Sequence, residues 1–157
     1  MSQKNKTIVI AEAGVNHNGN LKLALKLVDI AAESKADYIK FQTFFTNDLV
    51  QKKIGLAKYQ KKNIKKTTSQ YKMLKKLELS EKDHLKIIRR CKRKNIKFLS
   101  SPFDLKSIEL LKKLKLKLLK IPSGEITNTP YLRKIGKLRK KIILSTGMSN
   151  INEVKKQ

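Results

Sequence analysis

The sequence predicts an α/β protein in which parallel β-strands alternate with α-helices. Five short runs of apolar and β-branched residues are each followed by a segment whose apolar residues recur at helical spacing. Alternating units of this kind imply parallel strands joined by right-handed crossovers. The 157 residues, 39% of them hydrophobic, are enough for one domain or part of one. Two architectures fit this order, an open doubly wound sheet and a (β/α)8 barrel.

The first three predicted elements lie before residue 43. Residues 7–11 (TIVIA) form a short β-branched run and are predicted to be a buried strand. After the loop EAGVNHNGN, residues 21–33 are predicted to be a helix because one face is apolar. That face comprises Leu21, Ala24, Leu25, Val28, Ala31 and Ala32. Residues 36–42 (ADYIKFQ) are the second predicted strand.

The middle of the chain has a weaker pattern between residues 43 and 79, where only a short helix over 70–77 is predicted. The pattern SEKD at 80–83 is a capping box with Asp in place of Glu, and it begins a helix that runs to residue 94. The residues of this helix that we expect to face inward are Leu85, Ile88 and Cys91.

The remaining elements repeat the strand–helix order. Residues 96–100 (IKFLS) and 117–121 (KLLKI) are strands, and a helix capped by Asp104 lies between them. A Thr-Pro pair followed by glycine predicts a helix over 129–136, with Thr129 as its N-cap. Residues 141–145 (KIILS) are the fifth strand, and Asn150 begins a last helix. No G-x-G-x-x-G fingerprint follows the first strand, which weakens the dinucleotide-binding form of the open sheet.

The charge is strongly positive, with 38 Lys and Arg against 12 Asp and Glu and a formal net charge of +26. One interpretation is nucleic-acid binding, in which lysines neutralise phosphates. The other is a surface on which lysine fills most polar positions. We favour the second, because the lysines are spread along every predicted helix. A positive field still attracts an anionic substrate.

The cysteine and histidine content limits the possible sites. Cys91 is the single cysteine, so an internal disulfide is excluded, and no Cys or His cluster suits zinc. We expect His17 to be a loop histidine and His84 to be a histidine on the surface of a helix. The first apolar run is too short for a signal peptide, and no segment approaches membrane-spanning length. These features predict a cytoplasmic protein.

Polar side chains stand at the carboxyl end of every predicted strand, which is the edge where both candidate folds bind ligands. In chain order they are Glu12, Lys40, Gln42, Ser100, Ser101, Lys120, Ser123, Glu125, Ser145 and Thr146. Taken singly, Glu12 could cap the next helix, Lys40 could extend to the surface, and residues 145–147 could be an ordinary turn. Their common edge favours a shared site.

This set of side chains is typical of an anion site. Lysine ammonium groups supply positive charge for a phosphate, and serine hydroxyls with nearby backbone N–H groups supply donors. The carboxylates Glu12 and Glu125 suit a polyol beside the anion or proton transfer in a reaction. The residues therefore predict a phosphorylated or carboxylated small substrate and a hydroxylated partner.

Five segments together resemble the sialic acid synthase family, whose members make N-acetylneuraminate and relatives such as legionaminate. They are IAEAGVNHNG (10–19), ADYIKFQTF (36–44), FLSSPFD (98–104), KIPSGEITN (120–128) and ILSTGMS (143–149). The resemblance implies a (β/α)8 TIM barrel followed by a small antifreeze-like domain. Residues 1–157 would be the N-terminal part of the barrel, with about the first five strands.

The resemblance also implies a reaction, the condensation of phosphoenolpyruvate with an N-acetylhexosamine and release of phosphate. The sugar would be N-acetylmannosamine or a 2,4-diacetamido relative, with Mn²⁺ or Mg²⁺ as cofactor in the full-length enzyme. Lys40, Lys120, Ser123 and Ser145 would bind phosphoenolpyruvate. Glu12 would lie near the reacting carbon.

The sugar would be held by Glu125 and by Asn63, which lies in the loop after the second predicted strand. The catalytic residues would be Glu12, Lys40, Lys120 and Glu125.

The chain also departs from the family pattern. The two metal-binding histidines of the family come from later strands, and neither His17 nor His84 matches them. We therefore expect no metal site within these residues, no activity and poor stability of the 157-residue chain alone, and a homodimer for the full-length enzyme. The alternatives are pseudaminic acid synthase, another phosphoenolpyruvate-using or aldolase-type barrel and, remotely, a basic nucleic-acid-binding protein.

Overall fold

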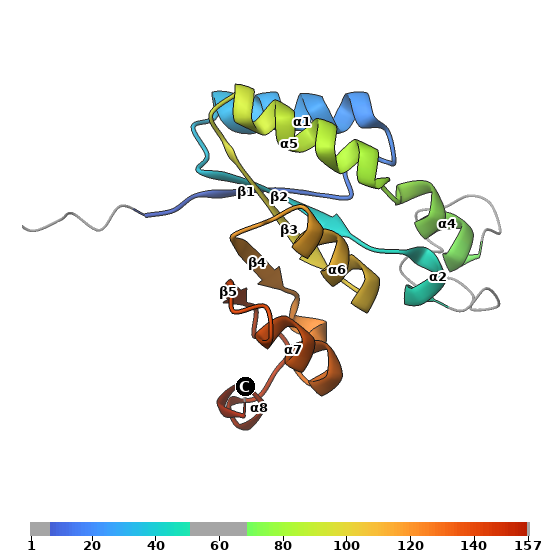
Figure 1. Ribbon diagram of the computed structural model, residues 1–157, viewed down its shortest axis with the longest axis vertical. Coiled ribbons are helices and arrows are strands. Elements are labelled where there is room, and N and C mark those ends of the chain that lie inside the picture. Colours follow the sequence, from blue (N-terminus) through green and yellow to red (C-terminus); the bar gives the residue numbers. More distant parts are fainter. Residues whose placement is uncertain (1–6, 51–68, 157) are drawn as a thin grey trace, which may run out of the picture.

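The computed structural model describes residues 7–50 and 69–156, and its strands are parallel as predicted (Figure 1). The strands are β1 (Ile10–Gly14), β2 (Tyr38–Thr43), β3 (Lys97–Pro102), β4 (Leu118–Ile121) and β5 (Lys141–Leu144). Hydrogen bonds join β1, β2 and β3 in that order and join β4 to β5. Strands β3 and β4 lie next to each other, so the five strands follow one another in chain order.

Most helices begin and end where the sequence predicts. They are α1 (Leu21–Glu33), α2 (Thr46–Leu49), α4 (Gln70–Leu77), α5 (Glu81–Arg93), α6 (Leu105–Lys113), α7 (Thr129–Gly136) and α8 (Ile151–Lys155), with a 3₁₀ turn, η1 (Ser123–Glu125), after β4. Helices α1 and α5 lie side by side over one face of the first three strands (Figure 1). Within the described ranges, no helix is both long and apolar enough to cross a membrane.

Capping side chains fix several of these helix boundaries. Ser80 and Asp83 form the predicted capping box of α5, and Asn150 forms another with Glu153 at α8. Asp104 caps α6 as expected. The N-cap of α7 is Asn128 and not Thr129, because the Asn128 side chain accepts a hydrogen bond from the Tyr131 backbone N–H.

The first strand begins three residues later than predicted. Val9 still bonds to the chain before β2, because its N–H donates to the Asp37 carboxylate and its carbonyl accepts from Tyr38. Regular pairing starts only at Ile10 opposite Tyr38. The prediction followed apolar residues, but Ile8 and Val9 are exposed. As a result Glu12 lies inside β1 instead of following it.

The inward face of α5 also differs from the prediction. The buried residues are His84, Ile87 and Cys91, whereas Leu85 is 39% exposed. The prediction of a surface histidine at position 84 was wrong, because hydrogen bonds at both ring nitrogens make its burial acceptable. His17 lies in the turn after β1, as expected, but it is fully buried.

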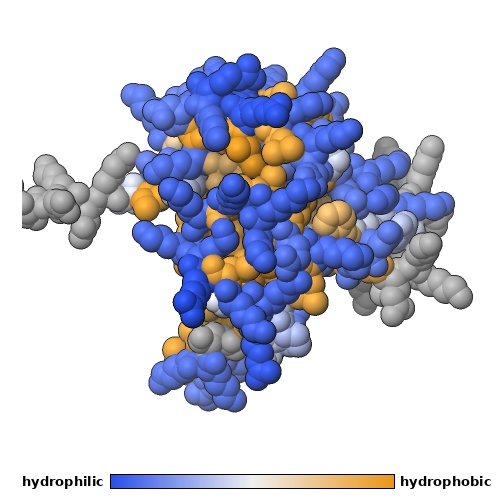
Figure 2. Space-filling view, viewed as in Figure 1, coloured by the Kyte–Doolittle hydropathy of each residue, from blue (hydrophilic) through white to orange (hydrophobic). Residues whose placement is uncertain are grey.

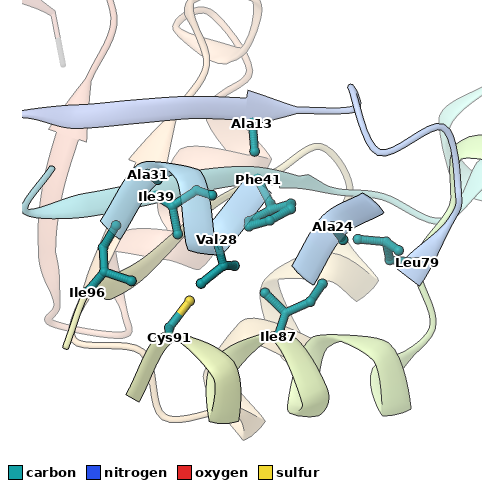
Figure 3. Close-up of a cluster of buried hydrophobic side chains, with 10 residues drawn as sticks. All are labelled: Ala13, Ala24, Val28, Ala31, Ile39, Phe41, Leu79, Ile87, Cys91 and Ile96. Atoms are coloured by element: carbon teal, nitrogen blue, oxygen red, sulfur yellow. The ribbon is translucent and has the colours of Figure 1, made fainter. Parts of the chain in front are cut away.

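The main core lies between α1 and α5 and the first three strands (Figure 3). Its buried members are Ala13, Ala24, Val28, Ala31, Ile39, Phe41, Leu79, Ile87, Cys91 and Ile96. Burial raises the pKa of the Cys91 thiol to about 12, so this cysteine is not a reactive thiolate at neutral pH. Hydrophilic side chains cover much of the face seen in Figure 2, as the lysine-rich composition predicts.

Candidate active site at the carboxyl ends of the strands

The strand register places the predicted site residues on one face. Successive side chains of a strand point to opposite faces, and paired residues of parallel neighbours point to the same face. Lys40 pairs with Glu12 of β1, and Gln42 pairs with Ser101 of β3. Their neighbour Phe41 is in the core under the helices. Glu12, Lys40, Gln42 and Ser101 therefore share the face opposite the helices.

Strand β4 follows the same alternation. Leu119 and Ile121 are buried in the helix-facing core clusters. Lys120 lies between them in sequence and pairs with Ile143 of β5. Lys120 consequently points to the same side as Glu12 and Lys40.

A close ion pair joins the first two strands. Lys40 Nζ lies 2.7 Å from Glu12 Oε2, and the exposed fractions of the two side chains are 9% and 55%. Lys40 therefore does not extend to the surface. Glu12 does not cap α1 either, because the N-cap of that helix is Asn20. The structural alternatives for Lys40 and Glu12 are thus excluded.

A bulge in β1 shapes the surroundings of Glu12. The pairing with β2 is irregular between Glu12 and Gly14, and Gly14 has a φ of +51°. A Cβ at position 14 would lie 3.1 Å from Glu12 Oε1 and 3.7 Å from the Gln42 amide nitrogen. Glycine thus leaves room for the carboxylate beside Gln42.

The electrostatics of Lys120 show that the charged groups share one neighbourhood. Burial and, after it, the positive charge of Lys40 lower the pKa of Lys120, while the negative charge of Glu12 opposes them. Two ammonium groups and one carboxylate are thus close enough to interact. A site with an excess positive charge of this kind favours an anion.

The loops after β4 and β5 bring the predicted serines to the same edge. Ser123 begins the η1 turn, and its Oγ would lie 3.6 Å from a Cβ built on Gly147. Ser145 directly follows β5, and its N–H donates to the Ile121 carbonyl at 3.1 Å. The two hydroxyl-bearing turns are therefore neighbours.

Ser101 is a further candidate that the sequence did not single out from Ser100. It is 1% exposed, and its Oγ has no hydrogen-bond partner among the described residues. A buried hydroxyl without a partner is unusual and indicates a missing ligand or water. Its register beside Gln42 is the signal that distinguishes it, whereas Ser100 faces the helices.

The sugar-binding predictions are only partly located. The half-buried Glu125 ends η1, and its Oε2 accepts a hydrogen bond from the Asn128 side-chain amide at 2.6 Å. Its charge contributes, after burial, to raising the pKa of Tyr131. Asn63 lies outside the described residues. Gly124 has no positive φ and open space beside it, so the turn does not require glycine for its backbone.

The described residues do not make a metal site. No three His, Cys, Asp or Glu side chains gather anywhere in the described ranges. Of the two carboxylates at the site, Glu12 is paired with Lys40 and Glu125 with Asn128. These side chains do not fit a divalent ion on their own.

The chain resembles curated proteins along almost its whole length. The chain is 57% identical over 149 residues to N,N'-diacetyllegionaminic acid synthase of Campylobacter jejuni, covering 95% of this chain and 45% of that protein. It is 51% identical over 147 residues to the synthase of the same name from Legionella pneumophila, covering 94% and 41%. The chain thus spans less than half the length of these curated relatives.

A solved structure supports the fold. N-acetylneuraminic acid synthetase from Leptospira borgpetersenii, in complex with citrate, matches with a TM-score of 0.79 and 30% identity, over 99% of this chain and 52% of that one. Residues 27–157, most of the chain, match the model described as the NeuB family. The chain belongs to this family, that of the sialic acid synthases.

Proposed function

We propose that the complete gene product containing these residues condenses phosphoenolpyruvate with an N-acetylated hexosamine to form a nonulosonic acid and phosphate. The observation that carries this proposal is the cluster of Glu12, Lys40 and Lys120 on one face at the strand ends. The similarity to diacetyllegionaminic acid synthases supports it. The enzyme is then a transferase that forms a carbon–carbon bond.

The chemistry assigns a role to each group. The methylene carbon of phosphoenolpyruvate bonds to the aldehyde carbon of the open-chain sugar. Water then adds to the former enol carbon, and the proton that this water loses goes to the aldehyde oxygen, which becomes a hydroxyl group. The bond from the former enol carbon to the phosphate oxygen breaks, so phosphate leaves with the electron pair and that carbon becomes the ketone. Lys40 and Lys120 hold the anionic substrate, with hydroxyl donors from Ser123, Ser145 and Ser101.

Glu12 suits the positioning or activation of the attacking water. Its carboxylate is held 2.7 Å from Lys40 and remains 55% exposed, so it is both oriented and accessible. The divalent metal of the proposed enzyme would require ligands other than the described residues, and no step above is assigned to it. Metal-ligating histidines beyond residue 157 remain a prediction.

The sugar proposal follows from the most similar relatives reported above. Both are named for diacetyllegionaminic acid, so we propose a 2,4-diacetamido hexose as the substrate in preference to N-acetylmannosamine. Glu125 would hold its hydroxyl groups, with Asn63 as a second contact. We propose the cytoplasm as the compartment and a homodimer as the assembly.

The test is a substrate panel with the complete gene product. Phosphoenolpyruvate is supplied with N-acetylmannosamine, with the legionaminate-type diacetamido hexose or with its pseudaminate-type relative, each with Mn²⁺ or Mg²⁺. We expect phosphate release and a 2-keto acid product, fastest with the legionaminate-type sugar. Phosphate release only with the pseudaminate-type sugar would identify the protein as a pseudaminic acid synthase. No phosphate release with any sugar would refute the proposal.

The 157-residue polypeptide serves as a comparison in the same assay. We propose that it is inactive alone, because it spans 45% of the Campylobacter relative and β1 has a single hydrogen-bonded strand neighbour within the described ranges. Light scattering of the complete gene product tests the dimer.

A further inference from the structure

A buried polar relay lies on the helix-facing side of β2 and β3, at the same strand ends as the site. Thr43 Oγ1 lies 2.9 Å from His84 Nε2 and 2.7 Å from Ser100 Oγ. All three residues are at most 2% exposed. His84 Nδ1 lies 2.9 Å from the backbone carbonyl oxygen of Ser80, the N-cap of α5. The relay therefore connects the start of α5 to two strands.

The chemistry of the partners fixes the proton on His84. A carbonyl oxygen only accepts, so Nδ1 carries the hydrogen that is donated to Ser80. In the neutral ring Nε2 is then an acceptor, and the Thr43 hydroxyl donates to it. Ser100 donates its single proton to Thr43 Oγ1 or to the Phe41 carbonyl at 3.1 Å. Burial lowers the pKa of His84, so the neutral ring with its hydrogen on Nδ1 is the form we expect at neutral pH.

On each of the two strands, a residue of the relay is the direct neighbour in sequence of a residue of the site. Thr43 follows Gln42, Ser100 precedes Ser101, and Gln42 pairs with Ser101 across the two strands. The Phe41 carbonyl that Ser100 contacts belongs to the residue after Lys40. A change in the twist or separation of these strand ends would move Lys40 and the Ser101 hydroxyl relative to each other.

We propose that His84 is a positioning residue, which acts through Thr43 and Ser100 to hold the ends of β2 and β3 in the geometry that binds an anion. The proposal rests on the proposed function for the identity of that anion, phosphoenolpyruvate. His84 touches no substrate in this scheme. Its contribution is the spacing between Lys40 and Ser101.

The test compares substitutions that keep or remove one bond of the relay in the complete gene product. Thr43→Val is isosteric but has no hydroxyl, and Thr43→Ser restores it. His84→Gln offers an acceptor near the position of Nε2, whereas His84→Asn offers a donor near that of Nδ1. Ile39→Val is the matched control, because it removes a core methylene from the same face of β2 without touching the relay.

We expect Thr43→Val and His84→Asn to raise the Kd of phosphoenolpyruvate, measured by calorimetry, and its KM by about tenfold. The KM of the sugar should change less than about twofold. Thr43→Ser and His84→Gln should lie closer to the unsubstituted protein, and Ile39→Val should lower thermal stability alone. Circular dichroism checks that each variant is folded. Equal effects on both KM values, or none beyond those of Ile39→Val, would overturn the proposal.

A second measurement is independent of the reaction. Proton–nitrogen correlation spectra of the imidazoles should show His84 with a protonated Nδ1 and a bare Nε2 at neutral pH. A bare Nδ1, which cannot donate to the Ser80 carbonyl, would refute the relay even in an active enzyme. Conversely, if no sugar is converted but the spectrum shows this tautomer and phosphoenolpyruvate binding responds to Thr43→Val, the proposed function fails and the positioning role stands.

Discussion

At the residue scale, the pair of Lys40 and Glu12 is the feature on which the site depends. A lysine whose side chain is 9% exposed is stabilised only if a negative charge or strong acceptors compensate for its lost hydration, and Glu12 at 2.7 Å provides this. Lys120 is near enough for its pKa to be lowered by Lys40. The site without substrate thus has two ammonium groups and one carboxylate. An anionic substrate supplies the second negative charge that balances them.

This balance predicts the effect of removing one charge. Lys40→Met should raise the Kd of phosphoenolpyruvate by about one hundredfold, because charge-assisted hydrogen bonds contribute about 1.5–3 kcal/mol each. Lys22→Met, on the exposed face of α1, changes the net charge equally and is the control. Calorimetry on the complete gene product measures both. Equal weakening by the two substitutions would show that only the overall field matters.

The buried histidines predict how stability depends on pH. Burial, and for His17 also the charge of His84, lowers the pKa of both residues below 6.5. Between 6.5 and the lower folded-state pKa, the unfolded chain binds more protons than the folded one, so stability falls as pH falls through this window. Above about pH 6.5 the full stability is present.

Urea unfolding of the complete gene product between pH 8 and 5 measures this dependence. His84→Gln, which cannot titrate, should have a shallower slope between pH 6.5 and 5. Carboxylates such as Asp29, whose pKa its hydrogen bond to Arg90 lowers, act in a separate window near pH 4 and below. If His84→Gln leaves the dependence of the unfolding free energy on pH unchanged, protonation of the His84 ring is not its cause.

Some residues of the candidate site could be predicted from the sequence, and the reason is chemical contrast. Glu12, Lys40 and Lys120 are charged residues in otherwise apolar strands, so the sequence shows that they lie near the strand ends. Ser101 did not stand out, because two adjacent serines point to opposite faces and only the strand register shows which one faces the site. His84 was assigned to the surface, because the apolar residues of α5 fit two helical faces that differ by one position.

At the scale of elements, the turn after β1 is held by a close contact with α4. Gly19 has a φ of +72°, and a Cβ there would lie 1.8 Å from the backbone carbonyl oxygen of Lys76. In the same turn the His17 ring accepts a hydrogen bond from the Gly19 N–H at 3.0 Å. This glycine is required both by its backbone conformation and by a neighbour that cannot rotate away.

Gly19→Ala should therefore destabilise the protein by more than about 2 kcal/mol, since strain at positive φ adds to a backbone clash. Thermal unfolding of the complete gene product measures the loss. Gly136→Ala is the matched control, because nothing lies within 4 Å of a Cβ at that helix position, and it should be neutral or slightly stabilising. Similar losses for both substitutions would contradict the contact with α4.

Helices were predicted more accurately than strands, for a physical reason. Helix ends are set by local capping side chains such as Ser80, Asp104 and Asn150, which a sequence displays directly. Strand ends are set by partners distant in the sequence. The start of β1 depends on where Tyr38 lies, and its bulge between Glu12 and Gly14 is an irregularity of the pairing with β2. Helix α2, a single turn, has no periodic signal.

At the scale of the whole molecule, the parallel order of five strands follows from alternation alone, and the structure confirms it. The choice between an open sheet and a barrel did not follow from the residues, because both have the same alternation. That choice came from the five motifs, and the match to the Leptospira synthetase supports it at the level of the fold. Closure of a barrel requires strands beyond the five described.

The large positive charge of the chain has a different consequence under each of the two functional interpretations. For an enzyme that uses phosphoenolpyruvate, the formal charge of +26 on these residues raises the local concentration of an anionic substrate but leaves a neutral hexosamine unaffected. For a nucleic-acid-binding protein, the same charge produces tight binding to any duplex, with a steep dependence on salt.

Ionic strength therefore separates the two interpretations in one experiment on the complete gene product. Raising sodium chloride from about 0.05 to 0.5 M shortens the screening length severalfold, so the KM of phosphoenolpyruvate should rise several times more than that of the sugar. Filter binding should detect no tight complex with a random duplex at about 0.15 M salt, the physiological value. Strong duplex binding there, together with a KM for phosphoenolpyruvate insensitive to salt, would mean that the charge serves nucleic acid and not the substrate.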